Sequence, residues 1–325
     1  MPNTGPEPVV SRPVEVAIGL ILDARGRVLV TRRARGQHLA GFREFPGGKV
    51  AAGESPATAL ARELDEELGV RVGAAVQCLT IDHRYSERAV RLHVFRVSTW
   101  SGEPAPREGQ TMAWLRPDTL DPADFPAANR AMLNALRLPE RYLITPSPDD
   151  AGQADAIAER VVRALRAGRA GMVQVRAPAL DASAYRDFLA AIAGPAGALG
   201  IPVLANAPAD WLTGFPEVGL HLPERRWREL ETRPDRGGWI GASVHDRAGL
   251  ARVAALGLDF VVLGPVEVTA THPGAEVLGW ERFTAWTAGA GVPVYALGGM
   301  TPGHLAQARR AGAQGIAGIR GLLDG

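Results

Sequence analysis

The sequence predicts two domains of different fold class, an α+β domain with a mixed sheet followed by a small parallel (β/α)8 barrel of the α/β class. Its 325 residues exceed the roughly 100 to 200 residues of a typical domain. Strand pairs around one well-delimited helix come first, whereas short apolar strands alternate with helices from Tyr142 onward. We expect a disordered tail at 1–13, domains at 14–138 and 142–325, and a short linker between the domains.

The composition excludes several classes of partner. The chain has 46% hydrophobic residues, 22% charged residues and a formal net charge of +1. This composition gives no reason to expect a nucleic-acid polymer as a partner. The single cysteine, Cys78, excludes an internal disulfide framework and a cysteine zinc cluster, so we expect a cytoplasmic protein. Residues 1–13 lack the apolar core of a signal peptide, and no run approaches the roughly 20 apolar residues of a membrane span.

The elements of the first domain follow from strand and capping signals. Residues 14–22 and 28–32 are β-branched strands joined by a turn, which is a hairpin signal. A helix over 55–68 has Ser55 as N-cap, Pro56 at its first position and a glycine just past its end. The domain is completed by two apolar strands at 76–81 and 90–97, a short strand at 114–115 and a closing helix at 127–136.

The second domain shows eight short apolar strands that alternate with helical segments. Near-continuous apolar strands joined by helices are typical of a parallel sheet that is buried on both faces. A doubly wound open sheet has the same periodicity and stays open as the alternative. The strands are expected at 142–145, 172–176, 202–206, 219–222, 239–244, 260–265, 293–299 and 315–319.

The helix of the first domain carries an acidic face. Glu63, Glu66 and Glu67 lie three and four residues apart, so their carboxylates converge on one side of the helix. A solvated acidic surface is the ordinary interpretation of such a charge run. The glycine-rich loop before the helix, with Glu54 and Arg62 at fixed offsets, instead favours an oxygen-rich site for Mg²⁺ or Mn²⁺.

This stretch resembles the Nudix box, the signature of hydrolases that act on nucleoside diphosphates linked to another group. Gly48, Glu54 and the segment 62–70 match its fixed positions at the required spacing. The sequence is similar to the MutT branch, whose members hydrolyse oxidised guanine nucleoside triphosphates, at 31–33, 36–49, 102–104, 107–110 and 124–129. The resemblance implies an α/β/α sandwich with a mixed sheet.

The resemblance also implies a metal site and a general base. Metal ions would neutralise the triphosphate and activate a water, so that nucleoside monophosphate and pyrophosphate are released. Glu63 is the favoured base and Glu108 the alternative, while Glu54 and Arg62 support the helix. The implied metal ligands are the Gly47 carbonyl, Glu63, Glu66, Glu67 and Glu108, and the implied catalytic set is Glu63, Glu66, Glu67, Glu108 and Arg62.

Asn129 is the candidate reader of an oxidised base. Oxidation at C8 turns guanine N7 from an acceptor into a donor while O6 remains an acceptor, and one amide can serve both. With ordinary guanine the amide would face an acceptor where it needs a donor, which is costly when buried. An N-cap before Arg130 is the competing role for Asn129. Arg33, His38 and Phe45 are expected in the same pocket, although Phe45 also fits a core position.

The second domain resembles thiamine-phosphate synthase and its TenI-like relatives. The matching segments are 173–176, 205–206, 219–222, 241–245, 263–265, 269–271, 296–301 and 318–321. Gly298, Gly299 and Gly318 follow the last two strands and fit a phosphate site made of backbone N–H groups, with tight turns as the alternative. The resemblance implies that Arg176 and Ser243 grip a diphosphate, whereas a strand-end salt bridge is the ordinary role for Arg176.

The second domain departs from the synthases at charged positions. The lysines that the resemblance implies are replaced by Pro178 and His272, and the domain contains no lysine. The metal-binding aspartate implied after Asn206 is Ala207, and a second one, implied past His221, is also missing. We therefore expect the barrel to have lost synthase chemistry.

Three histidines of this domain could supply an acid–base catalyst, because histidine titrates near neutral pH. A structural role is the ordinary alternative for each of His221, His245 and His272. The histidine position of the related tautomerases is occupied by Pro265.

The leading hypothesis is a Mg²⁺- or Mn²⁺-dependent hydrolase that removes 8-oxo-dGTP from the nucleotide pool, with an appended barrel that binds thiazole phosphate or a similar ligand. A second hypothesis has the first domain hydrolyse a thiamine-related or other diphosphate. A third makes the barrel a non-catalytic interaction module. The expected partners are small molecules, without a nucleic-acid polymer or a membrane.

Overall fold

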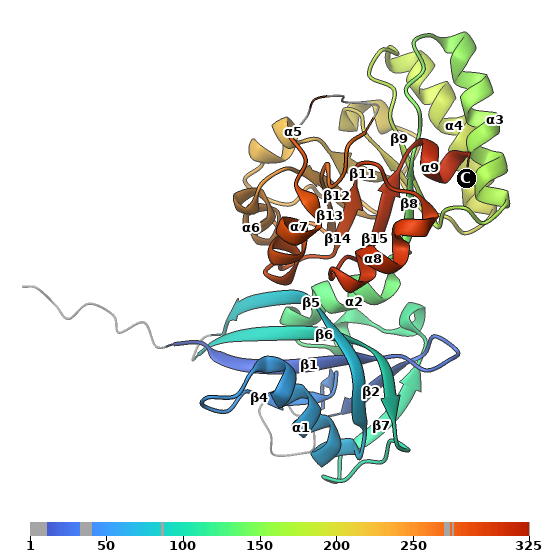
Figure 1. Cartoon of the computed structure of the whole chain (residues 1–325). Helices are drawn as coiled ribbons and strands as arrows, with labels where there is room; N and C mark the ends of the chain where they lie inside the picture. Colours follow the sequence, from blue (N-terminus) through green and yellow to red (C-terminus); the bar gives the residue numbers. More distant parts are fainter. Residues whose placement is uncertain (1–11, 33–40, 86–87, 270–273, 275, 325) are drawn as a thin grey trace, which may run out of the picture. The chain divides into compact units, whose positions relative to one another are not determined.

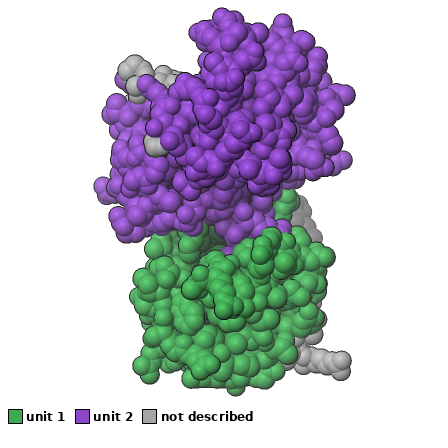
Figure 2. All heavy atoms as spheres, turned by 90° about the vertical axis from the view of Figure 1, so that its right-hand side faces the viewer, with its two compact units in different colours: residues 1–130 green, residues 131–325 purple. Residues whose placement is uncertain are grey.

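The computed structural model describes residues 12–32, 41–85, 88–269, 274 and 276–324, so residues 1–11 of the expected tail lie outside the described residues. The chain forms two compact units, Met1–Arg130 and Ala131–Gly325 (Figures 1 and 2). The described part contains no helix that is long and apolar enough to cross a membrane.

The first unit is built on a mixed four-stranded sheet and a second, antiparallel sheet. In the order β4-β1-β6-β5, only β1 and β6 run parallel, and the other neighbours are antiparallel. This confirms the expected mixed sheet. The four strands are β1 Val14–Ile21, β4 Gly47–Lys49, β5 Arg71–Arg84 and β6 Ala89–Ser101. The second sheet has the order β3-β2-β7, with β2 Val28–Arg32, β3 Arg43–Glu44 and β7 Thr111–Leu115.

Helix α1, Pro56–Leu68, packs beside strand β1 (Figure 1). The Ser55 hydroxyl accepts a hydrogen bond from the Thr58 N–H, and Gly69 ends the helix in the left-handed region with φ 70°. The side chains of Leu60, Leu64 and Leu68 are fully buried. Their four-residue spacing turns the glutamates between them away from this core.

The second unit is a closed barrel of eight parallel strands, so the open-sheet alternative is wrong. The order β10-β11-β12-β13-β14-β15-β8-β9 closes because Ile316 to Gly318 pair with the first strand of the barrel. The strands are β8 Arg141–Ile144, β9 Met172–Val175, β10 Val203–Ala205, β11 Gly219–Leu222, β12 Ile240–Val244, β13 Phe260–Leu263, β14 Val294–Leu297 and β15 Gly315–Gly318.

Helices surround the barrel, with one exception (Figure 1). After β10 the chain forms a 3-10 turn, Ala209–Leu212, where a helix was expected. Pro208, Gly214 and Pro216 punctuate this short connection, which leaves no room for a regular helix. The helices are α3 Ala151–Arg166, α4 Ala182–Ala198, α5 Glu224–Arg228, α6 Arg247–Ala255, α7 Gly279–Ala288, α8 Leu305–Arg310 and α9 Arg320–Leu323.

Helix α2, Arg130–Arg137, lies almost wholly within the barrel unit. The Asn134 amide donates to the buried Asp259 carboxylate over 3.2 Å, and Arg233 pairs with the same carboxylate at 2.7 Å. Leu138 joins the apolar cluster of Tyr142 and its neighbours inside the barrel. The sequence places this helix in the first domain, whereas the contacts divide the chain just after Arg130.

Candidate functional site

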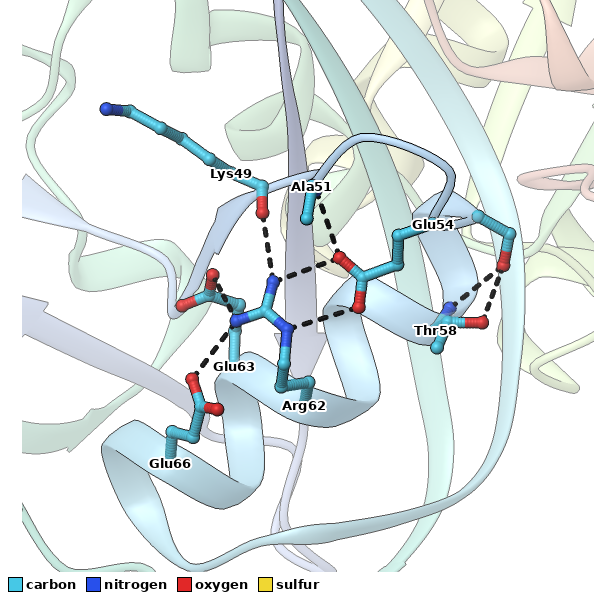
Figure 3. A network of polar contacts seen from close by, with 8 residues as sticks. Lys49, Ala51, Glu54, Thr58, Arg62, Glu63 and Glu66 are labelled. Carbon is cyan, nitrogen blue, oxygen red and sulfur yellow. Dashed lines mark hydrogen bonds and ion pairs between the residues drawn. The ribbon is translucent and has the colours of Figure 1, made fainter.

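The acidic face of α1 is organised around the guanidinium group of Arg62 (Figure 3). Nε and Nη2 each donate to the Glu54 carboxylate over 3.1 Å. On the other side, Nη1 donates to Glu63 over 2.9 Å and to Glu66 over 3.0 Å. These bonds raise the pKa of Arg62, and Arg62 together with the Ala51 N–H lowers the pKa of Glu54. The arginine therefore stays charged and fixes the position of three carboxylates.

The glycine loop at β4 lies directly against Glu63. A Cβ atom on Gly48 would lie 2.1 Å from the carboxyl carbon of Glu63, far inside any allowed contact. The Arg62 side chain reaches the same loop, because it donates to the Lys49 carbonyl over 3.1 Å. The loop and the helix thus bring a backbone edge and a carboxylate into direct contact, which only glycine permits.

Glu67 is the carboxylate with the most perturbed environment. Its Oε2 atom accepts a hydrogen bond of 3.3 Å from the Gly47 N–H. Burial, followed by the negative charges of Glu108, Glu63 and Glu44, raises the pKa of Glu67 to about 7. Negative charge is thus concentrated at this end of the helix.

The segment that carries Glu108 is fastened to the C-terminal end of α1. The Arg107 N–H donates to the Glu67 carbonyl over 2.9 Å, and the Arg107 guanidinium donates to the Asp65 carbonyl over 2.7 Å. The Gln110 amide also donates to the Glu67 carbonyl. Glu108 is exposed, yet this anchoring holds it close enough to act on Glu67 electrostatically.

The donor set suits a hard divalent cation. Carboxylates and a backbone carbonyl are the ligands that Mg²⁺ and similar ions prefer, and a cation would relieve the crowding of charge at Glu67. Within the described ranges no three potential ligands are already gathered in metal-binding geometry. Glu66 is 57% exposed and tied to Arg62, so it lies at the edge of the group. Sequence reasoning missed Glu44, whose only signal is its place just before Phe45 in the glycine-rich loop.

A cavity of about 420 Å³ adjoins this carboxylate group. Phe45 lines it and stacks on Phe125 with ring centroids 5.3 Å apart. Asn129 also lines it and is 6% exposed, and its side-chain amide has no hydrogen-bond partner among the described residues. Arg33 and His38 lie outside the described residues. Tyr85 and Arg88 line the cavity as well, and nothing in their sequence context singled them out.

Among the residues that the structure describes, the side chain of Asn129 makes no capping hydrogen bond. Asn129 is the last residue of a 3-10 turn, Ala127–Asn129, that runs directly into α2. Its backbone N–H donates to the Pro126 carbonyl, as an ordinary turn residue does. The amide is therefore left facing the cavity.

The barrel has its own cavity of about 750 Å³ at the carboxyl ends of its strands. All five residues expected at a phosphate site line it: Arg176, Ser243, Gly298, Gly299 and Gly318. Arg176 is half-buried and donates to the Ser147 hydroxyl, so the strand-end salt bridge is not formed among the described residues. These three glycines thus line a common space with Ser243 and two arginines, Arg176 and Arg320, and the backbone N–H groups of such glycines can bind a phosphate.

His221 belongs to a buried polar row inside the barrel. Its Nε2 atom lies 2.8 Å from the Ser243 hydroxyl and its Nδ1 atom 3.2 Å from the Tyr142 hydroxyl. Burial, and secondarily the charge of Arg176, lowers the pKa of His221 to about 3. A neutral imidazole locked between two hydroxyls favours the structural role over acid–base catalysis.

The other two histidines differ from His221. His245 is exposed, and its Nδ1 atom lies 2.9 Å from the Gly264 carbonyl. His272 lies outside the described residues. Pro178 is exposed and Ala207 is buried, so neither position offers a charge to the cavity.

Comparison with known proteins also divides the chain into two parts, but the boundary lies between residues 135 and 141 and not at Arg130. A family model described as "NUDIX domain" matches residues 17–135, and one described as "Thiamine monophosphate synthase" matches residues 141–322. The first part is 39% identical over 123 residues to the 8-oxo-dGTP diphosphatase of Haemophilus influenzae, covering 38% of this chain and 90% of that protein. It is 35% identical over 124 residues to the 8-oxo-dGTP diphosphatase of Escherichia coli, covering 38% and 96%.

The second part has relatives of another kind. It is 32% identical over 184 residues to the thiamine-phosphate synthase of Thermus thermophilus, covering 56% of this chain and 87% of that protein.

Proposed function

Since the chain belongs through residues 17–135 to the NUDIX family and through residues 141–322 to the thiamine monophosphate synthase family, we propose that it hydrolyses 8-oxo-dGTP to 8-oxo-dGMP and pyrophosphate. The first domain is a hydrolase, and hydrolases of this family need a divalent metal ion. Relatives that are named 8-oxo-dGTP diphosphatase support the substrate. The protein would thereby remove an oxidised precursor from the cytoplasmic nucleotide pool.

We propose Mg²⁺ as the metal, with Mn²⁺ as a substitute. Glu63, Glu67, Glu108 and the Gly47 carbonyl would hold it, with Glu66 at the periphery. When bound, the ion neutralises the triphosphate and lowers the pKa of a water molecule. The negative charges of Glu63, Glu108 and Glu44 around Glu67 support this assignment. Carboxylates so close together repel one another unless a cation or a proton neutralises part of their charge.

Glu63 is the proposed general base. Arg62 holds its Oε1 atom, which leaves Oε2 to accept the proton of the attacking water. The oxygen of that water bonds to phosphorus while the bond to the departing pyrophosphate breaks. Arg62 is a positioning residue in this scheme, since it touches the carboxylate and not the substrate.

The observation that carries the substrate proposal is the unpartnered amide of Asn129 beside Phe45. Its oxygen can accept from the N7–H of 8-oxoguanine while its nitrogen donates to O6. The Phe45 ring is 3% exposed and stacked on Phe125, so it supplies an apolar wall to the cavity that would hold the base. Ordinary guanine lacks the N7 proton and leaves the amide mismatched.

Replacing the amide tests this proposal. Asn129→Ala should reduce the kcat/KM preference for 8-oxo-dGTP over dGTP by about one to two orders of magnitude. The matched control is Asn134→Ala, because this asparagine bonds to Asp259 and lies in the barrel unit. Its preference ratio should stay at the wild-type value, and an unchanged ratio in Asn129→Ala would remove Asn129 from the pocket.

A parallel screen decides between the two hydrolase hypotheses. Nucleoside triphosphates and thiamine diphosphate are offered to the same enzyme preparation with Mg²⁺. We expect the highest kcat/KM for 8-oxo-dGTP. A higher value for thiamine diphosphate would replace the proposal with the thiamine-related one.

For the barrel we propose the binding of a small phosphorylated ligand, such as thiazole monophosphate, without synthase activity. The five residues that line the larger cavity support phosphate binding. The absence of lysine throughout the sequence of this domain, with Ala207 in place of the implied aspartate, speaks against the synthase reaction.

A further inference from the structure

A second cavity of about 370 Å³ opens beside the larger barrel cavity. Arg176, Asn206 and Pro223 line both, so the two spaces adjoin. The smaller cavity is lined further by Arg225 and Arg226 of α5. Its described lining contains three arginines and neither aspartate nor glutamate.

None of these arginines has a carboxylate partner within the described part of the chain. Arg225 is exposed and has no hydrogen-bond or ion-pair partner there. Arg226 is half-buried and donates to the Ala207 carbonyl, and Arg176 donates to the Ser147 hydroxyl. Arg228, on the same short helix but outside the cavity, pairs with two carboxylates.

Unneutralised guanidinium groups around a cavity favour an anionic ligand. A guanidinium offers a planar fork of donors that matches two oxygens of a phosphate group, and its charge persists at every physiological pH. The low exposure of Arg176 and Arg226 strengthens the attraction, since water screens these groups less than surface charges. Tyr185 and Trp211 close the cavity with aromatic surface.

A divalent cation does not fit this cavity. The resemblance to thiamine-phosphate synthase implies aspartates after Asn206 and past His221 as metal ligands. Ala207 and the pair Arg225 and Arg226 occupy these segments instead, and no carboxylate lines the space among the described residues. A hard cation would find no anionic oxygen there and would be repelled by three positive charges.

The resemblance to thiamine-phosphate synthase already implies a diphosphate beside Arg176. We propose that in this chain the diphosphate is bound in this cavity without a metal ion, because Arg225 and Arg226 together with Arg176 take the place of the cation. Since the smaller cavity adjoins the glycine-lined cavity, a ligand with a phosphate group at each end can occupy both. Mg²⁺ weakens binding here, because it neutralises the diphosphate and presents a cation to the arginines. The subsite goes beyond the proposed monophosphate ligand, and either assignment can fail without the other.

The test is titration calorimetry of the full chain with inorganic pyrophosphate, first in EDTA and then in excess Mg²⁺. In EDTA the acidic hydrolase site repels pyrophosphate, so the measured binding belongs to the barrel. Arg225→Ala and Arg226→Ala should each weaken it about tenfold or more. Arg225 bonds to nothing in the described structure, so its variant keeps the fold even if Arg226→Ala does not.

Arg166→Ala is the matched control, because Arg166 is also exposed and without a described partner but lies on α3, outside both cavities. Its affinity should equal the wild-type value. The binding heat that depends on Arg225 is the difference between the wild type and Arg225→Ala. This difference should be smaller in excess Mg²⁺ than in EDTA. Wild-type affinity in both cavity variants, or binding that appears only with Mg²⁺ and is lost in Arg225→Ala, would overturn the proposal.

Discussion

At the scale of single residues, Glu67 couples stability to catalysis. Its folded-state pKa of about 7 lies above the ordinary value of 4.5. The unfolded chain therefore binds fewer protons between these values, so ionisation of Glu67 destabilises the metal-free fold as the pH rises from 4.5 to 7. A bound cation reverses that effect by favouring the charged form.

Glu67→Gln should therefore lower kcat by about a thousandfold at saturating Mg²⁺ while leaving the metal-free fold at least as stable as the wild type. Steady-state kinetics and thermal unfolding in EDTA measure the two effects. Asp65→Asn is the control, since Asp65 is an exposed neighbour whose carboxylate has no hydrogen-bond or ion-pair partner among the described residues, and it should change neither. A folded Glu67→Gln enzyme with near-normal kcat would exclude Glu67 from the metal site.

At the scale of elements, the packing of the β4 loop on α1 sets the position of Glu63. A Cβ atom on Gly48 meets the end of a flexible side chain and not the backbone. Gly48→Ala should therefore displace the Glu63 carboxylate and cost about a hundredfold in kcat, with little change in Tm.

Gly194→Ala provides the comparison, because a Cβ atom there meets nothing within 4 Å. Its kcat should be that of the wild type. If Gly48→Ala retains full activity, the contact with Glu63 has no part in positioning the base.

His221 links three strands of the barrel, since it lies on β11 and contacts Tyr142 of β8 and Ser243 of β12. Its folded-state pKa of about 3 lies below the ordinary 6.5. The unfolded state thus binds the proton more readily, and stability that is present above pH 6.5 is lost as the pH falls toward 3.

The barrel should therefore be about 1 kcal/mol less stable at pH 5.5 than at pH 7.5 through this group. Urea unfolding of the wild type and of His221→Gln at both pH values measures the effect. The glutamine side chain does not titrate in this range. The stability that His221→Gln loses between pH 7.5 and pH 5.5 should therefore be smaller than that of the wild type by about 1 kcal/mol. Identical losses in both proteins would mean that His221 is not buried as a neutral group.

At the scale of the whole molecule, the two units have separate hydrophobic cores. Separate cores favour separate unfolding transitions. Thiazole monophosphate should stabilise only the barrel, by about 2.7 kcal/mol at a concentration of 100 times Kd. Arg176→Ala should abolish that shift in thermal unfolding of the full chain.

The full-length wild-type protein should not join thiazole and pyrimidine precursors into thiamine phosphate in the presence of Mg²⁺. Product formation would refute the loss of synthase chemistry. If neither the wild type nor Arg176→Ala responds to phosphorylated ligands, the barrel is a structural module.

The sequence by itself determined both family assignments, the mixed sheet, all eight barrel strands and the caps of α1. These features are local, because strand periodicity, capping residues and fixed motif spacing act over a few residues. The comparisons confirm both resemblances. Strands β5 and β6 are longer than the sequence predicts. Their outer residues belong to the strands because they pair with each other in a long hairpin whose register shifts at bulges.

Only the tertiary structure decided that the parallel sheet closes, because closure rests on pairing between β15 and β8, which are about 170 residues apart in sequence. Its contacts also group most of α2 with the barrel unit, where Asn134 donates a hydrogen bond to Asp259, although the family match to the first domain runs to residue 135. Glu44 enters the carboxylate group, and Arg225 and Arg226 enter the second cavity, only through folding. The physical reason is that the charge environment of a site depends on groups brought together by distant segments, which no local pattern records.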